Sequence, residues 1–548
     1  MATPHAPITL APTTGAALLA DFDRRRAGEG VEAARAGIMK ALAGGAAAQW
    51  LECVRAFVLR ADVETAREIC SAALDEHPDS ADLRYALAGL FRQTREDAKA
   101  EALLREIVAT HHDHVAATFL LARILKDEGR TSAAASAMNA LFRNTRHGVN
   151  TTIQAIELLD DCGRKQEASA IVEAEIDAGA NDVRLHAYAG MLDIQIGEFE
   201  RARRHYSEVI AGAPAQAFEW QVPHGLAASQ RYEDATHPDF DYFRMGLDRS
   251  DLSDKARASL LFALGKALDD VGDYAEAARR FAQGNAIVRT FTPWSRKNWR
   301  RMIDAKVAAK PLTHRVAAVR DWSPLFIVGV PRSGTTVIAE RLSRHADVVN
   351  RGELAWLSFL AGQLSRGGAI DASALEKNAA TYAAQLRQDD GDGRWFIDKQ
   401  PLNLLHVDLI LALFPDAKII HCRRNARDTA LSLWQQFFLA EEQNFAYDFA
   451  DIAAVIQGCD RLMTRWQALH AASIRSVRYE DFTTDPDGVI AGLRDWLDLG
   501  RDDEAATPAP AISTSSLWQA RQAVYTRSVG RWSAYAPYIP ELLGLPDA

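Results

Sequence analysis

The sequence predicts two domains of different class, a helical repeat region followed by an α/β domain built on a parallel sheet. Three observations indicate this. Alanine recurs every 34 residues in the first half, short apolar segments alternate with helical patterns after Pro324, and the first of those segments runs into a glycine turn. With 548 residues, the chain is long enough for more than one domain.

The changes of composition along the chain give four expected segments. We expect a lead-in over residues 1–30, the repeat solenoid over 31–290, a basic connector over 291–322 and the α/β domain over 323–548.

The composition excludes several classes of protein. A net charge of −10 argues against a general nucleic-acid binder, because neutralising phosphates needs an excess of Lys and Arg. The five cysteines are scattered without a CxxC pair, so we expect neither a disulfide framework nor a zinc site, and a cytoplasmic location fits. Neither a signal peptide nor a membrane span is apparent.

The repeat region is recognised by its small residues. One alanine stands in each of five successive 34-residue periods, at Ala66, Ala100, Ala134, Ala168 and Ala202. A glycine lies five residues before each of the last three, at Gly129, Gly163 and Gly197. We expect each alanine where two helices of a hairpin cross closely, and each glycine in the turn between them.

The best copies, GEFERARRHYSEVI from Gly197 and GDYAEAARRFAQGN from Gly272, resemble tetratricopeptide repeats, and the resemblance covers about residues 45–290. It implies a superhelix whose concave face holds a peptide or partner protein, although such repeats also serve dimerisation, so a homodimer stays open. Residues 221–243 break the period and are interpreted as a degenerate repeat rather than an insertion.

Two polar clusters outside the α/β domain have competing interpretations. His111, His112 and His114 lack cysteine partners, so a solvated turn between repeats is expected there rather than a metal site. Nine cations and only Asp304 as an acid occupy residues 289–320. They either attract an anionic ligand or belong to a solvated helix that ends before Pro311.

The α/β domain opens with PLFIVGVPRSGTT, residues 324–336. A buried strand, a tight turn and a helical pattern over 337–345 predict a phosphate loop. Thr335 stands where the Walker pattern has Lys. A nucleoside triphosphate needs that cation, whereas a less charged phospho group is held by backbone N–H groups, hydroxyls and one Arg. Such parts are supplied by Arg332, Ser333, Gly334, Thr335 and Thr336.

Four further strands are expected in the segments DVVNR, RWFIDK, AKIIHCRR and SIRSVRYE, with helices between them, among them 402–413 and 427–439. A second anion site follows the third of these segments. Arg424 at the strand end can donate a bidentate pair of hydrogen bonds to a phosphate, and Ser432 lies on the early turns of the next helix. Two anion sites on one sheet imply a ligand with phosphates at both ends of a nucleoside.

The pairing of PRSGTT with an Arg and a Ser eight positions later resembles the sulfotransferases, over about residues 325–535. The resemblance implies that the first loop holds the 5′-phosphosulfate, and the second site the 3′-phosphate, of 3′-phosphoadenosine-5′-phosphosulfate (PAPS). Within that family the tyrosylprotein sulfotransferases are most similar, and a bacterial protein joining both domains is implied. The resemblance implies a tyrosine of a peptide or protein as the acceptor.

The resemblance also implies roles for individual residues of this sequence. Glu353 in NRGELAW matches the proposed general base, and Lys399 in DKQP matches a lysine against the bridging oxygen and sulfonate. Tyr479 in VRYED and Ser516 match residues near the nucleotide, and Arg531 matches a basic residue on the phosphate. The family places a further Arg on the 3′-phosphate helix, and here that place holds Gln435 and Gln436.

The chemistry agrees with these roles. A phenol has a pKa of about 10, so an acceptor needs a base, for which Glu353 is the candidate. Lys399 and Arg332 would neutralise the sulfonate and the leaving phosphate, and no metal is required because the transferred group carries a single charge.

Alternatives remain at the level of sequence. Glu353 pairs with Arg351, Lys399 forms a surface pair with Asp398, or Tyr479 is plain core. The acceptor is a small molecule or saccharide instead, the domain is an inactive scaffold behind its repeats, or, least expected, the chain is a P-loop kinase.

Overall fold

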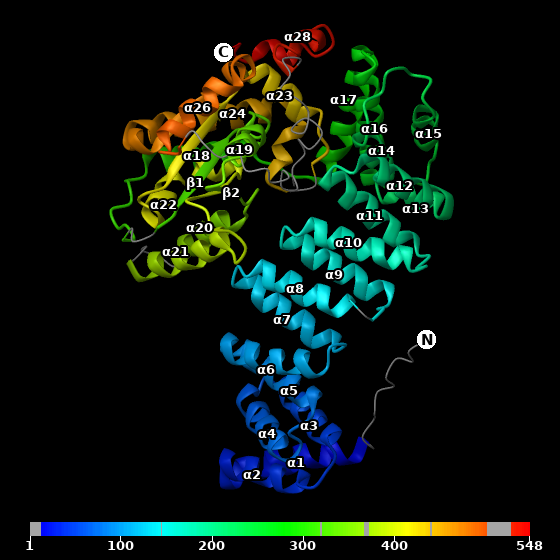
Figure 1. Ribbon diagram of the computed structural model, residues 1–548, viewed down its shortest axis with the longest axis vertical. Coiled ribbons are helices and arrows are strands. Elements are labelled where there is room, and N and C mark those ends of the chain that lie inside the picture. The colour runs from blue at the N-terminus through cyan, green and yellow to red at the C-terminus, as the bar shows by residue number, and fades with distance from the viewer. Residues whose placement is uncertain are drawn as a thin grey trace. The chain divides into compact units, whose positions relative to one another are not determined.

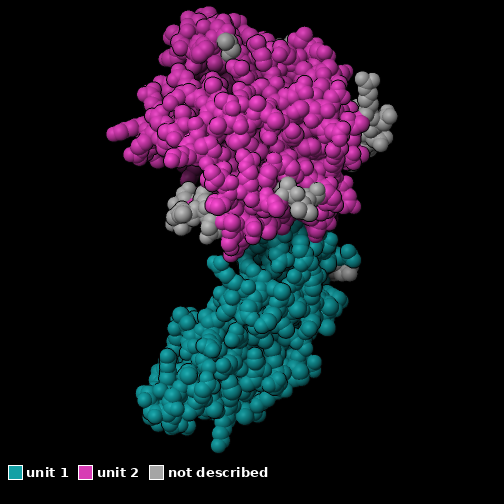
Figure 2. Space-filling view, turned by 90° about the vertical axis from the view of Figure 1, so that its left-hand side faces the viewer, with its two compact units in different colours: residues 1–147 teal, residues 148–548 magenta. Residues whose placement is uncertain are grey.

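The computed structural model describes residues 12–143, 145–317, 321–366, 372–438, 441–500 and 528–547. The chain falls into two compact units, residues 1–147 and 148–548 (Figure 2), and each is described by itself. In the described part of the chain, no helix has the length and apolar character needed to cross a bilayer.

The first unit consists of helices that follow one another in antiparallel hairpins (Figure 1). Their bounds are α1 Pro12–Glu29, α2 Val31–Leu42, α3 Ala47–Leu59, α4 Val63–Glu76, α5 Ala81–Gln93, α6 Asp97–Thr110, α7 Val115–Asp127 and α8 Thr131–Phe142. The side chains of Phe22, Trp50 and Phe57 are buried between the first of them.

The repeats continue in the second unit as α9 Val149–Asp161, α10 Lys165–Asp177, α11 Val183–Ile196 and α12 Phe199–Gly212. The last hairpin is α16 Asp254–Asp270 with α17 Tyr274–Phe291. Between these pairs the period is broken by three short helices, α13 Pro214–Glu219, α14 Val222–Ala228 and α15 Pro238–Leu247.

The structure confirms the roles expected from the 34-residue period. The five alanines of that period lie on α4, α6, α8, α10 and α12 and are all completely buried. Gly129, Gly163 and Gly197 have φ angles of 77°, 73° and 89°, a backbone conformation that favours glycine, in the turns that follow α7, α9 and α11. The histidine cluster also forms the expected turn, with His111 at the end of α6 and His114 accepting a hydrogen bond at the start of α7.

The connector helix α18, Arg296–Ala308, ends before Pro311 as expected and packs against α24, Phe449–His470. Arg296 forms an ion pair of 2.6 Å with Asp451, and the Trp299 indole donates to the Ala454 carbonyl at 3.0 Å. These contacts favour a structural role for the basic connector.

Each of the five segments expected to form strands does so. The strands are β1 Ser323–Gly329, β2 Val348–Asn350, β3 Trp395–Asp398, β4 Lys418–Arg423 and β5 Ile474–Arg478, all parallel in the order β2-β3-β1-β4-β5. The chain reverses its direction of travel across the sheet between β1 and β4, and ligands bind at the carboxyl ends of strands at such a switch point.

Alternating residues of β1 face two cores. Leu325 and Ile327 pack with α19 Thr335–Leu342, α25 Tyr479–Thr484 and α26 Pro486–Trp496. Phe326 and Val328 join a larger core with α20 Trp356–Arg366, α21 Ala372–Arg387, α22 Val407–Leu413, α23 Ala426–Trp434 and α24. This second core continues into α16 and α17 through Phe262 and Phe281, so the last repeat and the sheet share one apolar interior.

Two expected helices differ in extent. The segment expected as a helix over 402–413 is a 3₁₀ helix, Pro401–His406, before α22 begins. The helix expected over 427–439 is α23, and it ends at Trp434. There the side-chain amide of Asn285 on α17 donates to the Trp434 carbonyl at 3.0 Å, which satisfies a group that another helical turn would have used.

Candidate active site

The phosphate loop lies between β1 and α19, where Arg332 and Gly334 have positive φ angles of 75° and 96°. Gly334 is required for a second reason. A Cβ atom there would lie 2.5 Å from Cδ2 of Tyr479, so the tyrosine ring packs directly on the loop backbone. Because α19 begins shortly after the carboxyl end of β1, its first backbone N–H groups are near that edge of the sheet, where an anion site is expected.

Ser333 is the most informative side chain of this loop. It is only 2% exposed, and its Oγ has no hydrogen-bond partner among the described residues. Buried hydroxyl groups are normally satisfied, so this one is suited to an oxygen atom of a bound ligand. Thr335 and Thr336 follow on the first turn of α19 and are also buried.

The second predicted anion site adjoins the first because β4 pairs with β1 in the sheet. Arg424 follows β4 and donates from Nη1 to the Arg332 carbonyl at 3.1 Å. The Asn425 side chain caps α23 through the N–H groups of Arg427 and Asp428, at 3.0 and 3.2 Å. Ser432, two turns further, accepts a hydrogen bond of 3.0 Å from Arg332 Nε. The structure therefore joins both predicted anion sites.

Tyr479 bridges this pair to the C-terminal part of the chain. Its ring lies 4.9 Å from the Arg424 guanidinium carbon, and its hydroxyl is 2.8 Å from Ser528 Oγ. Arg424 also donates to the Ser528 carbonyl at 2.6 Å. The interpretation of Tyr479 as plain core is wrong, because the side chain is half-buried and contacts both the loop and Arg424.

Arg531 lies on the turn after Ser528, and two carboxylates hold it. The buried Asp428 accepts from the backbone N–H groups of Gly530 and Trp532, at 2.7 and 2.9 Å. Asp269, at the end of α16, forms an ion pair with the Arg531 guanidinium. Sequence reasoning missed both aspartates, and no local signal marks Asp269 as a partner of a residue 262 positions away.

Glu353 and Lys399 meet at the ends of β2 and β3. The Lys399 ammonium, 2% exposed, forms an ion pair with the Glu353 carboxylate, whose side chain is 31% exposed. The backbone N–H of Lys399 also donates to the Gly352 carbonyl at 2.7 Å. Two alternatives from the sequence are wrong: Arg351 pairs with Asp390 instead of Glu353, and Lys399 is buried rather than part of a surface pair.

Asp398 holds the backbone next to both members of this pair. One carboxylate oxygen accepts the N–H groups of Leu354 and Gln400, at 3.4 and 2.9 Å, so it binds the residue after Glu353 and the residue after Lys399. The other accepts from Tyr382 and Asn403. Burial raises the pKa of Asp398 to about 6, although these four donors oppose the shift. The sequence marked Asp398 only as a neighbour of Lys399.

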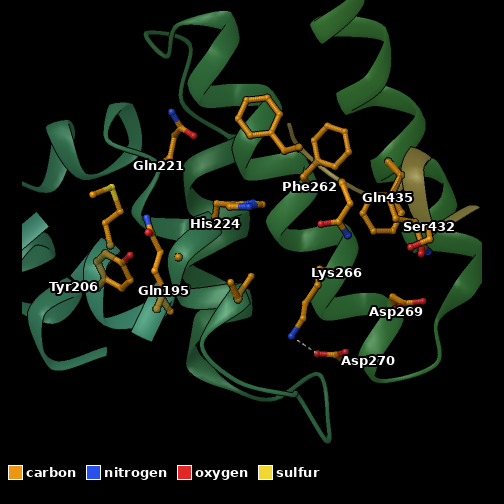
Figure 3. A pocket seen from close by; sticks show the side chains of 18 of the residues that line it. Gln195, Tyr206, Gln221, His224, Phe262, Lys266, Asp269, Asp270, Ser432 and Gln435 are labelled. Carbon is orange, nitrogen blue, oxygen red and sulfur yellow. Dashed lines mark hydrogen bonds and ion pairs between the residues drawn. The ribbon is translucent and has the colours of Figure 1, made fainter. Parts of the chain in front are cut away.

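A cavity of about 1580 Å³ opens beside Arg424 and Ser432, within the second unit (Figure 3). The α/β domain contributes Arg424, Asp428, Ser432, Gln435, Tyr479 and Arg531 to its lining, and the repeats contribute Tyr188, Gln195, Trp220, His224, Phe262, Lys266, Asp269 and Asp270. Burial lowers the pKa of His224 to about 4, so its ring is a neutral hydrogen-bonding group. The cavity is thus formed jointly by the repeats and the sheet domain.

Two expectations about the site stay predictions. Ser516 lies outside the described residues. The absence of a metal requirement also stays a prediction. Among the described residues, Glu173, Asp193 and His205 have potential ligand atoms within 4.8 Å of one another, but Arg201 already donates to Asp193, at 2.6 and 2.8 Å.

Comparisons with known proteins match a segment in each part of the chain. Residues 324–503 match the model of the sulfotransferase family, and residues 59–124 match a tetratricopeptide repeat model. An uncharacterized protein of Aquifex aeolicus is 28% identical over 391 residues, 66% of this chain and 50% of its own length. Nodulation protein NoeE of Sinorhizobium fredii is 30% identical over 148 residues, 22% of this chain and 35% of its own. The chain thus matches half or less of each of these relatives.

Solved structures show weaker likeness. The sulfotransferase domain of the Synechococcus olefin synthase has a TM-score of 0.32 at 18% identity, covering 42% of this chain and 98% of that one. Sulfotransferase STF1 of Mycobacterium tuberculosis has a TM-score of 0.25 at 18% identity, covering 59% and 98%. With TM-scores this low, these structures add nothing to the family match.

Proposed function

We propose that this chain, in which a sulfotransferase family domain follows tetratricopeptide repeats, transfers a sulfuryl group from PAPS to an acceptor hydroxyl. The observation that carries the proposal is the hydrogen bond between Arg332 and Ser432, which joins two anion sites at the switch point of the sheet. A ligand with phosphates at both ends of one nucleoside suits such a pair.

The polar groups of both sites fit this nucleotide. The phosphate loop and Ser333 would hold the 5′-phosphosulfate, and Arg424 and Ser432 the 3′-phosphate. Two buried atoms, Ser333 Oγ and Arg424 Nε, have no partner within the described residues, and phosphate oxygens would supply one. The missing Walker lysine disfavours a triphosphate and hence the kinase alternative.

PAPS, when bound, supplies the sulfuryl group and a bisphosphate leaving group. Glu353 would accept the acceptor's proton while the acceptor oxygen bonds to sulfur and the bond from sulfur to the 5′-phosphate oxygen breaks. Lys399 is paired with Glu353 and buried, so it sits where it can neutralise charge on the sulfonate and the departing oxygen. Arg332 would neutralise negative charge on the departing 5′-phosphate.

The acceptor we favour is a tyrosine of a peptide or protein. Pockets for small ligands span roughly 300–1,000 Å³, and the cavity of about 1580 Å³ exceeds that range, although Glu353 and Lys399 are not among its lining residues. The repeats line that space with aromatic and amide side chains, Tyr188, Gln195 and Trp220 among them. A small molecule or saccharide is the second candidate, because amides and aromatic rings also suit it.

The first experiment is calorimetric titration with adenosine 3′,5′-bisphosphate, with ATP plus magnesium as the control. Metal-independent binding of the bisphosphate, weakened by Arg424→Ala and less by Arg424→Lys, is expected. Binding of ATP but not of the bisphosphate would indicate the kinase. If neither ligand binds, the inactive scaffold is indicated. An acceptor screen with labelled sulfate then compares a tyrosine peptide with its phenylalanine analogue and with saccharides; sulfation of saccharides only would overturn the tyrosine proposal.

We also propose a reducing cytoplasm as the compartment. The five cysteines are buried and unbonded, as Cys422 on β4 exemplifies, and burial raises the pKa of that thiol to about 12.

A further inference from the structure

One ion pair connects the last repeat to the nucleotide side of the α/β domain. Asp269 lies in the last turn of α16 and uses both carboxylate oxygens: Oδ2 pairs with the Arg531 guanidinium and Oδ1 accepts a hydrogen bond from the Tyr535 hydroxyl. Its side chain is 9% exposed. A buried carboxylate held this way fixes the direction of the side chains that it binds.

We propose that Asp269 is a positioning residue for the nucleotide, and that it aims Arg531 at the 3′-phosphate. The inference rests on the proposed function. Arg531, Arg424 and Ser432 line one cavity together with Asp269, and Figure 3 shows Asp269 and Ser432 on the same side of it.

The guanidinium retains donors for a ligand. Arginine carries five N–H donors, and within the described residues Asp269 is the hydrogen-bond partner of the Arg531 side chain. Burial alone would lower the pKa of Arg531, but the charge and hydrogen bond of Asp269 outweigh it and raise the pKa. Arg531 therefore stays a cation, with its remaining donors available to a phosphate.

The backbone around Arg531 is equally constrained. Asp428 binds the N–H groups on both sides of it, and Arg427 lies 4.4 Å over the ring of Trp532. The backbone is thus held by α23 and the side chain by α16. Only the second restraint comes from the repeats.

This arrangement would compensate for a missing cation in the α/β domain. Gln435 and Gln436 line the cavity near Ser432 and carry no charge. A phosphate dianion is bound best by more than one cation. Arg424 supplies one from the sheet, and Arg531, aimed from the repeat side, would supply another. Affinity for the nucleotide then depends on how the last repeat packs against the sheet domain.

The test titrates the full chain and two variants, Asp269→Asn and the matched control Asp254→Asn, with two nucleotides. Asp254 is exposed at the start of the same helix and does not line the cavity. Adenosine 3′,5′-bisphosphate probes the 3′-phosphate, and adenosine 5′-phosphate lacks it. Asp269→Asn should weaken only the bisphosphate, by about tenfold, the equivalent of one charge-assisted hydrogen bond. Asp254→Asn should leave the preference between the two nucleotides unchanged.

Arg531→Ala supplies the second arm. If Asp269 acts through Arg531, Arg531→Ala weakens the bisphosphate by itself, and adding Asp269→Asn to it causes no further loss. Equal loss of both nucleotides in Asp269→Asn means general disruption, and unchanged or tighter bisphosphate binding means that Asp269 merely neutralises Arg531; each overturns the inference. If the unaltered chain does not prefer the bisphosphate, the proposed function itself fails.

Discussion

Arg332 donates from Nε to Ser432 Oγ at 3.0 Å, although the two residues are 100 positions apart. Arg332 belongs to the turn after β1, and Ser432 to the helix after β4. The contact exists because β1 and β4 are neighbours in the sheet, with Gly329 in register with Cys422. A ligand that spans both predicted anion sites would therefore meet this pair.

We predict that the two side chains act as a unit in nucleotide binding. Arg332→Ala and Ser432→Ala should each weaken adenosine 3′,5′-bisphosphate, and the double variant should deviate from additivity by at least about 0.5 kcal/mol. Calorimetric titration measures the cycle. Thr464→Ala, which removes a hydroxyl exposed on α24, is the control partner and should combine additively with Arg332→Ala. Additivity in the Ser432 cycle would mean that the sites act separately.

Glu353→Gln should lower kcat by roughly 100- to 10,000-fold, because the amide cannot accept the proton of the acceptor. The affinity for the bisphosphate should change by less than about twofold, since the carboxylate contacts Lys399 and not the predicted phosphate sites. Single-turnover sulfation with labelled donor measures the chemical step. Glu441→Gln, an exposed carboxylate on a nearby 3₁₀ helix, serves as the control, and full turnover by Glu353→Gln would disprove the base assignment.

Much of the architecture could be predicted because local patterns in the sequence determine it. The apolar segment around Phe326 and the glycine turn after it define a strand and a phosphate loop without any long-range information. The same holds for Ala168 and Gly163, whose burial and backbone angle follow from the repeat geometry. The meeting of Glu353 with Lys399 also follows, because each comes just after one of two strands that pair in parallel.

The remainder depends on contacts that no local pattern encodes. Asp269 sits in an ordinary acidic helix end, and only the packing of α17 against α28, Trp532–Tyr535, brings that end to Arg531. The early end of α23 depends likewise on Asn285, 149 residues before its partner Trp434. Side chains supplied by a distant element decide such features, so periodicity within either segment is uninformative about them.

Asp398 predicts a measurable pH dependence of stability. Its pKa is raised from 3.8 to about 6 in the folded chain, mainly by burial, so the folded state binds the proton more tightly than the unfolded state. Stability from this group is full below about pH 4 and is lost as the pH rises to about 6, amounting to about 3 kcal/mol. Asp398→Asn cannot titrate, so wild type should lose stability relative to it between pH 4 and 7.

Thermal unfolding of both proteins across this range makes the comparison. Asp495→Asn on the exposed face of α26 is the control and should follow wild type. If the difference between wild type and Asp398→Asn stays constant with pH, Asp398 does not titrate in this range. A drop in turnover of Asp398→Asn with unchanged bisphosphate affinity is also expected, because this carboxylate orders the backbone after Glu353 and Lys399.

Gly334→Ala separates backbone strain from contact with the tyrosine ring. Gly334 and Gly163 both have positive φ angles, 96° and 73°, so an added methyl group should cost about 1 kcal/mol of stability at either position. A Cβ at Gly163 meets nothing within 4 Å, whereas at Gly334 it meets Tyr479 at 2.5 Å. Only Gly334→Ala should therefore displace Tyr479 from Arg424 and weaken the bisphosphate. Equal nucleotide affinity in the two variants would show that the ring can move without cost, and Tyr479 would then have no part in forming the site.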